Sequence, residues 1–150
     1  MRILPVLTAL GCLLASCTTE AQLPSSWKIR LGSGGGIAAA YHGTEVDSEG
    51  AMTLSGSSLY PESRSSSRAQ LTAAELRSLR ELLEAAYPAS QAGKTPAAPY
   101  YVWFDIELAG GETRSFRPPY SRQVERLREL MEELAKKYQP VKAPRQESAG

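Results

Sequence analysis

The sequence predicts an α+β fold, in which an antiparallel sheet of about five strands carries two helices packed on one face. Segments with alternating apolar and polar residues come as a group of three and then a group of two. Each group is followed by a stretch in which apolar residues recur at helical spacing. Short turns link the strands within a group and favour antiparallel pairing, so the order is three strands, helix, two strands, helix.

The residues before the first strand predict where the protein resides. Arg2 is the only charge among the first 17 residues, and an apolar run from Ile3 ends in Leu-Ala-Ser before Cys17. A basic start, a short apolar run and small residues describe a secretory signal peptide. The alternatives are a transmembrane anchor, which needs about 20 apolar residues, a soluble secreted protein that is cut nearby and keeps a free cysteine, and cleavage before Cys12, which leaves a very short apolar run. We expect a signal peptide over residues 1–16 and a tether over 17–26.

The residues around Cys17 resemble the lipobox of bacterial lipoproteins, in which the cysteine is lipidated and becomes the new N-terminus. The resemblance implies a lipid anchor on Cys17 and a place in the bacterial cell envelope. In Gram-negative lipoproteins an aspartate in the next position usually retains the protein in the inner membrane. Thr18 occupies that position, so the resemblance implies the outer membrane, with the domain facing the periplasm.

The first group of strands begins the single domain, which we place over residues 27–138. Trp27, Ile29 and Leu31 alternate with charged residues and predict a half-buried strand. The glycine-rich run 32–36 is expected to end this strand. A turn over 47–50 separates the next two strands, and the three strands are predicted over 27–31, 37–46 and 51–54.

A serine-rich segment and a helix follow. Residues 55–70 contain few apolar groups, so we predict a mobile loop that cannot offset its ordering entropy. Thr72 and Glu75 then form a capping box, and a stripe of leucines predicts a helix that Pro88 ends.

The second half repeats the arrangement with two strands. After a predicted loop over 89–99, the segment 100–108 alternates, with Val102, Phe104, Ile106 and Leu108 on one face. A glycine turn and a short return strand follow, and a second amphipathic helix begins near Ser121. Its predicted ion pairs include Glu133 with Lys137. Residues 139–150 are expected to form a disordered tail.

Composition argues against several functions. Removal of residues 1–16 from the 150 leaves 134, and the loss of Arg2 leaves 16 basic and 16 acidic side chains, which gives no electrostatic reason for nucleic-acid binding. One cysteine is removed and one lipidated, so no disulfide or thiolate metal site is expected. His42 is the only histidine, and no catalytic motif accompanies it. We therefore expect a protein that is not an enzyme and that needs no metal or cofactor.

Two features are candidates for partner binding. The glycine run could be a flexible connection between strands, or its backbone could lie close against another protein because glycine has no Cβ. Tyr101 and Trp103 lie on the face opposite the predicted core, where they could mark a partner surface or be covered by the segments 55–70 or 89–99. The candidate partner-binding residues are Gly34, Gly35, Gly36, Ile37, Tyr101 and Trp103.

The domain also resembles a known family over about residues 27–137. The similarity lies in the run from Ser33 to Ala38, the acidic turn 46–48, the helix start 71–76, the strand 101–108 with its glycine hairpin, and the closing helix. These segments are similar to emfourin, a small bacterial protein inhibitor of protealysin and other thermolysin-like metalloproteases. The resemblance implies an inhibitor that blocks the zinc cleft of such a protease with a loop.

Two functional hypotheses follow. The first is a membrane-anchored envelope lipoprotein that inhibits a thermolysin-like metalloprotease through the loop at Gly34 to Ile37. Bulky replacements of Gly34 and Gly35 are then expected to weaken inhibition and to leave the fold intact. The alternative is a non-catalytic periplasmic interaction module that binds another envelope protein through the Trp103 face.

Overall fold

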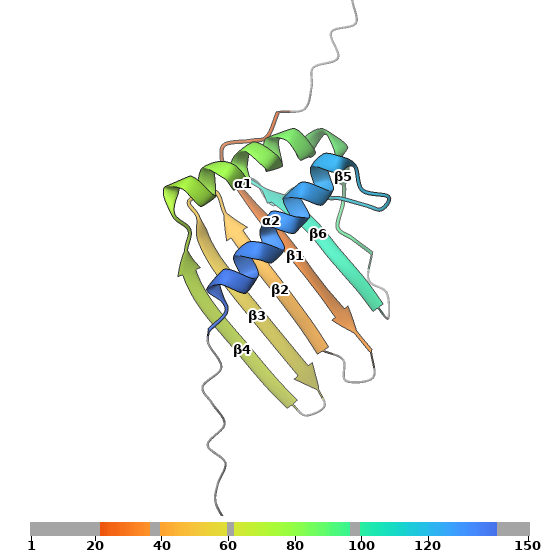
Figure 1. Ribbon diagram of the computed structural model, residues 1–150. Coiled ribbons are helices and arrows are strands. Elements are labelled where there is room, and N and C mark those ends of the chain that lie inside the picture. Colours follow the sequence, from red (N-terminus) through yellow and green to blue (C-terminus); the bar gives the residue numbers. More distant parts are fainter. Residues whose placement is uncertain (1–21, 37–39, 60–61, 97–99, 141–150) are drawn as a thin grey trace, which may run out of the picture.

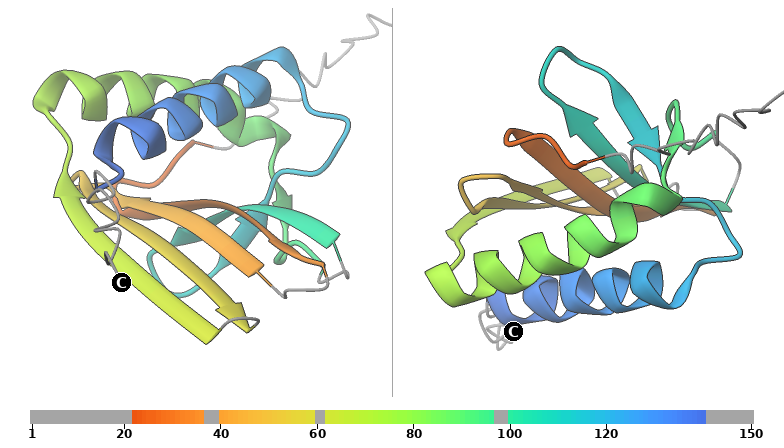
Figure 2. Two further views of the ribbon diagram at one scale, coloured as in Figure 1. Left: turned by 60° about the horizontal axis from the view of Figure 1, so that its bottom comes forward. Right: turned by 90° about the horizontal axis from the view of Figure 1, so that it is seen from above.

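In the part of the chain that the structure describes, a single antiparallel sheet carries two helices on one of its faces (Figures 1 and 2). The computed structural model describes residues 22–36, 40–59, 62–96 and 100–140. Cys17, Ile37 and the tail from residue 141 lie outside the described residues. The predicted α+β class is confirmed, although the described sheet has seven strands and the sequence predicted about five.

The sheet order is β4-β3-β2-β1-β6-β7-β5, and every neighbouring pair is antiparallel. The second helix ends the described fold, and a short 3-10 turn, η1, follows the first. The elements are β1 (Trp27–Gly35), β2 (Ala40–Asp47), β3 (Ala51–Leu59), β4 (Glu62–Gln70), α1 (Ala73–Ala86), η1 (Tyr87–Ala89), β5 (Gln91–Ala92), β6 (Tyr100–Leu108), β7 (Thr113–Ser115) and α2 (Arg122–Tyr138).

The glycine run does not end the first strand, contrary to the prediction. β1 continues to Gly35, and Gly34 pairs with Tyr41 of β2 on one side and with Tyr101 of β6 on the other. Two neighbouring strands therefore hold the glycine backbone in an extended ladder that its own composition would not favour. Only at Gly35 and Gly36, with φ of 117° and 84°, does the backbone take the left-handed conformations that glycine allows.

The predicted loop over residues 55–70 is also wrong. β3 runs on to Leu59, and β4 pairs with it along its whole length, from Ala51 with Gln70 to Leu59 with Glu62. Hydrogen bonds between the two backbones stabilise this hairpin, and they form with any of these side chains. Ala69, at the far end of the hairpin, packs against the core. The predicted loop over 89–99 likewise contains the two-residue strand β5, which pairs with β7.

The core lies between the sheet and the helices. Strand residues that alternate toward the helices are buried, and the helices bury the leucine stripes that the sequence predicted. Each fully buried large apolar side chain contributes about 1.5–3 kcal/mol to folding. The largest of these side chains are Phe104, Phe116, Ile29, Met52, Leu79, Leu83, Ile106, Leu127 and Met131.

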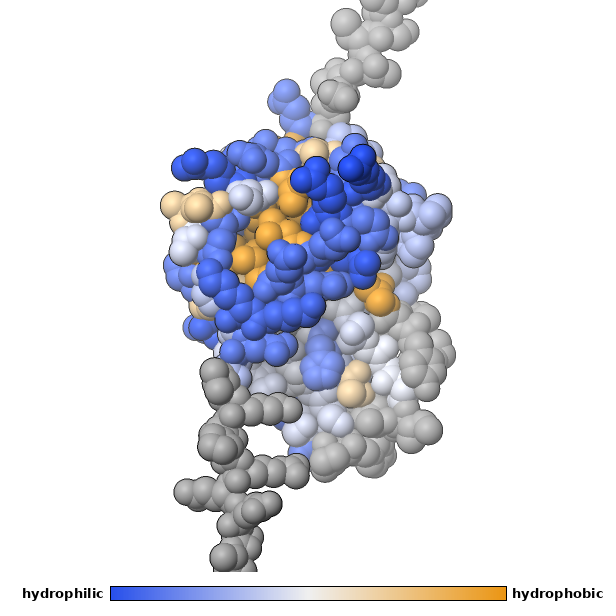
Figure 3. Space-filling view, viewed as in Figure 1, coloured by the Kyte–Doolittle hydropathy of each residue, from blue (hydrophilic) through white to orange (hydrophobic). Residues whose placement is uncertain are grey.

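The helices do not close completely over this core. Figure 3 shows an apolar area between α1 and α2, surrounded by polar residues. Leu76, Leu82 and Leu130 are partly buried and pack against the core from the two helices. None of the helices in the described part of the chain is long and apolar enough to span a membrane.

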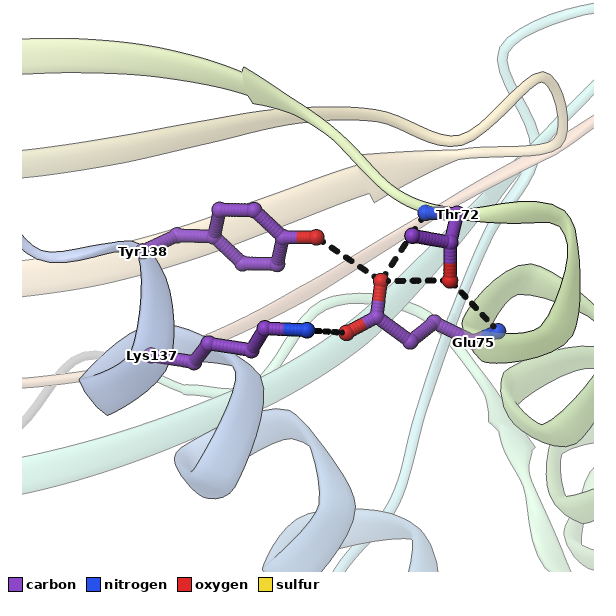
Figure 4. A network of polar contacts seen from close by, with 4 residues as sticks. All are labelled: Thr72, Glu75, Lys137 and Tyr138. Atoms are coloured by element: carbon purple, nitrogen blue, oxygen red, sulfur yellow. Dashed lines mark hydrogen bonds and ion pairs between the residues drawn. The ribbon is translucent and has the colours of Figure 1, made fainter.

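A polar cluster joins the start of α1 to the end of α2 (Figure 4). Thr72 accepts a hydrogen bond from the backbone N–H of Glu75 at 3.3 Å, and its own N–H donates to the Glu75 carboxylate at 2.9 Å, as in the predicted capping box. Tyr138 donates its hydroxyl to the same carboxylate at 2.7 Å, and the Lys137 ammonium pairs with it. Lys137 was predicted to pair with Glu133, which lies on its own helix.

The hydrogen bond from Lys137 and those from Thr72 and Tyr138 together lower the pKa of Glu75 to about 2. The carboxylate is therefore ionised at neutral pH, at the helix N-terminus, where negative charge is favourable. The cluster ties the two helices together at the end where β4 enters α1.

The sheet is longer than the helices that cover it. Figure 1 shows that α1 and α2 cross one half of the sheet, and that the strands continue past them at the lower end of the view. We call this part the bare end of the sheet. It comprises residues 32–35 of β1 with Gly36 after them, 40–43 of β2, 55–59 of β3, 62–65 of β4 and 100–103 of β6.

Candidate protein-binding surface

Among the described residues no helix packs on one face of the sheet, and we call it the open face (Figure 2). Residues paired across an antiparallel sheet point to the same side, and Trp103 pairs with Gly32, which pairs with Gly43. These residues alternate with buried core residues such as Leu31 and Phe104, so they lie on the open face. The predicted position of Trp103, opposite the core, is therefore what the structure shows.

Glycines on this face make room for aromatic rings. A Cβ atom added to Gly32 would overlap the Trp103 ring, and one added to Gly34 would overlap the ring of Tyr41. The Trp103 ring also reaches Gly43, where a Cβ atom would lie 3.4 Å from its Cζ2. The side chains of Trp103 and Tyr41 therefore lie over the backbone of β1, and the glycines are needed for that contact.

The structure brings together some of the predicted residues. Gly34 lies between Tyr41 and Tyr101, and Trp103 lies one row further along the open face. For Tyr101 the structure describes the backbone, and Ile37 is outside the described residues. Gly35 and Gly36 lie where β1 leaves the sheet, at the tip of the bare end.

Charged residues occupy the rest of the open face toward the start of β1. Arg30 pairs with Glu107 at 3.0 Å, and Lys28 pairs with Glu45 at 3.4 Å. These pairs connect neighbouring strands, and each is at least partly exposed, so each contributes no more than about 1 kcal/mol. The open face therefore has two parts, one with aromatic rings at the bare end and one with ion pairs at the other end.

The segment after β5 reaches the open face at one point. Asp105 of β6 accepts hydrogen bonds from the backbone N–H and the hydroxyl of Thr95, at 3.0 and 2.8 Å. Asp105 is only 7% exposed, so part of the 89–99 segment covers the open face at this residue. Cover by this segment was one of the alternatives that the sequence analysis left open. The segment 55–70 extends the sheet sideways as β3 and β4.

The opposite face of the bare end forms a groove against α2. Its volume is about 330 Å³. Val102, His42 and Leu54 contribute to its floor, and Arg128 and Ala135 line it from the helix. The sequence placed Val102 on the core face, which is the correct face, but the side chain is 49% exposed because the helices do not extend over it.

Two large apolar side chains are exposed among the described residues, and both lie at the bare end. Tyr41 is on the open face and Val102 is on the face with the helices. The sequence analysis chose neither residue as a candidate for partner binding, since each fits an ordinary strand pattern. Apolar groups of this kind on both sides of one narrow end suit contact with another protein.

The described residues contain no group of three histidine, cysteine, aspartate or glutamate side chains that could hold a metal ion. His42 lies exposed on β2, in the row that contains Gly56 and Ser65. A comparison of the chain with models of known protein families and with curated proteins finds no match. The family resemblance seen in the sequence therefore stays a prediction.

Proposed function

We propose that this protein is a lipid-anchored protein of the bacterial cell envelope that binds another protein with the bare end of its sheet and has no catalytic activity or cofactor. The observation that carries the proposal is the exposure of Tyr41 and Val102 at the same end, on opposite faces. A partner that received this end in a cleft would cover both side chains at once. The glycine turn after β1 lies at its tip.

We propose a thermolysin-like metalloprotease as the partner. The resemblance to emfourin supports this choice, and the exposed side chains of Tyr41 and Val102 at the bare end agree with it. Inhibition would then come from obstruction of the cleft, with the zinc ion supplied by the protease alone. Cys17 would hold the inhibitor at the membrane, on the periplasmic side of the outer membrane.

The test is a titration of a thermolysin-like protease with the full chain solubilised in detergent. The rate at which the protease cleaves a peptide substrate is the measured quantity. We expect saturable inhibition, with the inhibitor itself left uncut. A Val102→Glu variant should inhibit at least tenfold more weakly, because it places a charge at the proposed contact. Ala109→Glu is the matched control, since Ala109 is exposed in the turn just after the other end of the same strand.

Two results would contradict this proposal. The absence of inhibition at micromolar excess would rule out the protease as partner. Equal inhibition by Val102→Glu and the unmodified chain would rule out the bare end as the contact surface.

The open face, on which no described helix lies, favours a second candidate, a non-catalytic periplasmic interaction module with a different partner. In this case Trp103→Ala should abolish binding to an envelope protein that the unmodified chain retains. The unfolding midpoint must be measured alongside, because the Trp103 ring also covers Gly32 and Gly43.

A further inference from the structure

β4 forms the outer edge of the sheet along nine residues. Alternate residues of an edge strand point their backbone N–H and C=O groups away from the sheet, where no neighbouring strand receives them. Figure 1 shows no described helix or strand on the outer side of β4. Most of its residues are exposed, so these backbone groups are accessible to another chain.

The side chains of β4 permit close approach and carry a positive charge. Serine occupies positions 63, 65, 66 and 67, and the strand contains no proline that would block pairing. Arg64 and Arg68 both point to the open face, four residues or about 13 Å apart. Both are exposed, and among the residues that the structure describes neither has an ion-pair partner.

We propose that the edge of β4 binds an extended acidic peptide segment, which adds to the sheet as a further strand and places carboxylates opposite Arg64 and Arg68. Backbone hydrogen bonds would supply the pairing, and the two arginines would select the charge. A second copy of this chain fits less well. Pairing β4 with itself would bring four arginines and two glutamates into one small area, because each strand contributes Arg64, Arg68 and Glu62.

This proposal is tested apart from the proposed function, since β4 contains neither Tyr41 nor Val102, although Arg64 lies within the bare end. The probe is a capped, fluorescently labelled peptide of seven residues, with glutamate at its second and sixth positions and threonine or valine elsewhere. Its binding to the full chain in detergent is followed by fluorescence anisotropy. We expect a lysine version of the peptide to bind at least tenfold more weakly, and added salt to weaken the glutamate peptide.

Charge reversal locates the site. Arg64→Glu with Arg68→Glu should reduce binding of the glutamate peptide at least tenfold and improve binding of the lysine peptide. Arg77→Glu with Arg126→Glu is the matched control, because it makes the same change of charge at exposed positions on the two helices. Equal loss in both double variants would show a general charge effect and overturn the proposal.

Two N-methylated glutamate peptides test strand addition itself. One is methylated at its odd positions and the other at its even positions, so that each loses the N–H groups on one edge. We expect only one of the two to lose binding. Unchanged binding by both, or a concentration-dependent dimer of the chain that the arginine variants abolish, would overturn the proposal.

Discussion

At the bare end, single glycines decide whether aromatic rings can lie on the sheet. Gly32 and Gly34 lie beneath the rings of Trp103 and Tyr41, and there is no space for a Cβ atom at either position. The sequence analysis expected bulky residues at Gly34 to leave the fold intact. A side chain at Gly34 must displace the Tyr41 ring, so we expect it to lower the stability of the fold as well.

Gly34→Val should therefore destabilise the protein by about 1–3 kcal/mol, the usual cost of overpacking. Urea unfolding followed by circular dichroism measures the change. In a Tyr41→Ala background the same substitution should cost at least about 1 kcal/mol less, because the ring it displaces is gone. Ser33→Val, at the exposed neighbouring position, is the control. Equal stability of Gly34→Val and the unmodified chain would contradict the contact.

The low pKa of Glu75 predicts that the protein loses stability in acid. Its pKa is about 2 in the folded protein and near 4.5 in an unfolded chain, so the unfolded chain binds more protons between these values. The contribution of Glu75 to the free energy of unfolding is therefore complete above about pH 5 and disappears as the pH falls from 4.5 toward 2. Glu75→Gln should flatten the stability curve over this range.

The measurement is the free energy of unfolding from urea titrations at several pH values between 2 and 7. At pH 7, Glu75→Gln should cost about 1–2 kcal/mol, since it removes a helix cap and a charged hydrogen bond. Glu81→Gln on the exposed side of α1 is the control. The same pH dependence in Glu75→Gln and the unmodified chain would contradict the role of the cluster.

At the scale of elements, the sequence correctly predicted features that depend on residues close together in the chain, such as the starts of the helices. The caps at Thr72 and Ser121 are where α1 and α2 begin, because a side chain and a nearby backbone N–H make each cap. The sequence analysis missed β4 because its serines and arginines do not alternate with apolar residues. β4 also pairs with β3, a strand that was itself predicted too short. Its existence depends on pairing between segments, which no local pattern records.

The same reasoning applies to the candidate site. Gly34 and Trp103 could be chosen from composition and alternation, but their relation to Tyr41 depends on the register of three strands. The exposure of Val102 depends on where the helices stop over the sheet. The residues of the bare end were therefore predictable one by one, and their arrangement was not.

The pairing of β4 can be tested by amide hydrogen exchange. We expect alternate amides between residues 62 and 70 to exchange slowly, because their N–H groups donate to β3, and the amides between them to exchange quickly. Two-dimensional NMR of the chain transferred to deuterated buffer resolves the two groups. Rapid exchange of all amides in this segment would restore the original prediction of a loop.

At the scale of the whole molecule, the two ends of the sheet have different neighbours. The chain enters β1 at Trp27, at the end of the sheet that the helices cover, and leaves it at Gly35 (Figure 1). Nine residues of strand place these points about 30 Å apart. Residues 17–26 can span about 35 Å at most. A membrane anchor at Cys17 would therefore be attached through the covered end of the sheet, by a tether long enough to let the bare end meet a partner.

This arrangement depends on the lipid at Cys17, which leads to the last prediction. Cys17→Ser should move the protein from the membrane fraction to the soluble fraction, because a lipidated cysteine is the proposed attachment. Cys12→Ser is the matched control and should leave the protein in the membrane fraction, since that residue lies within the predicted signal peptide. Fractionation of cells and mass spectrometry of the N-terminal peptide measure both. An unmodified Cys17 thiol in the mature protein would contradict the anchor.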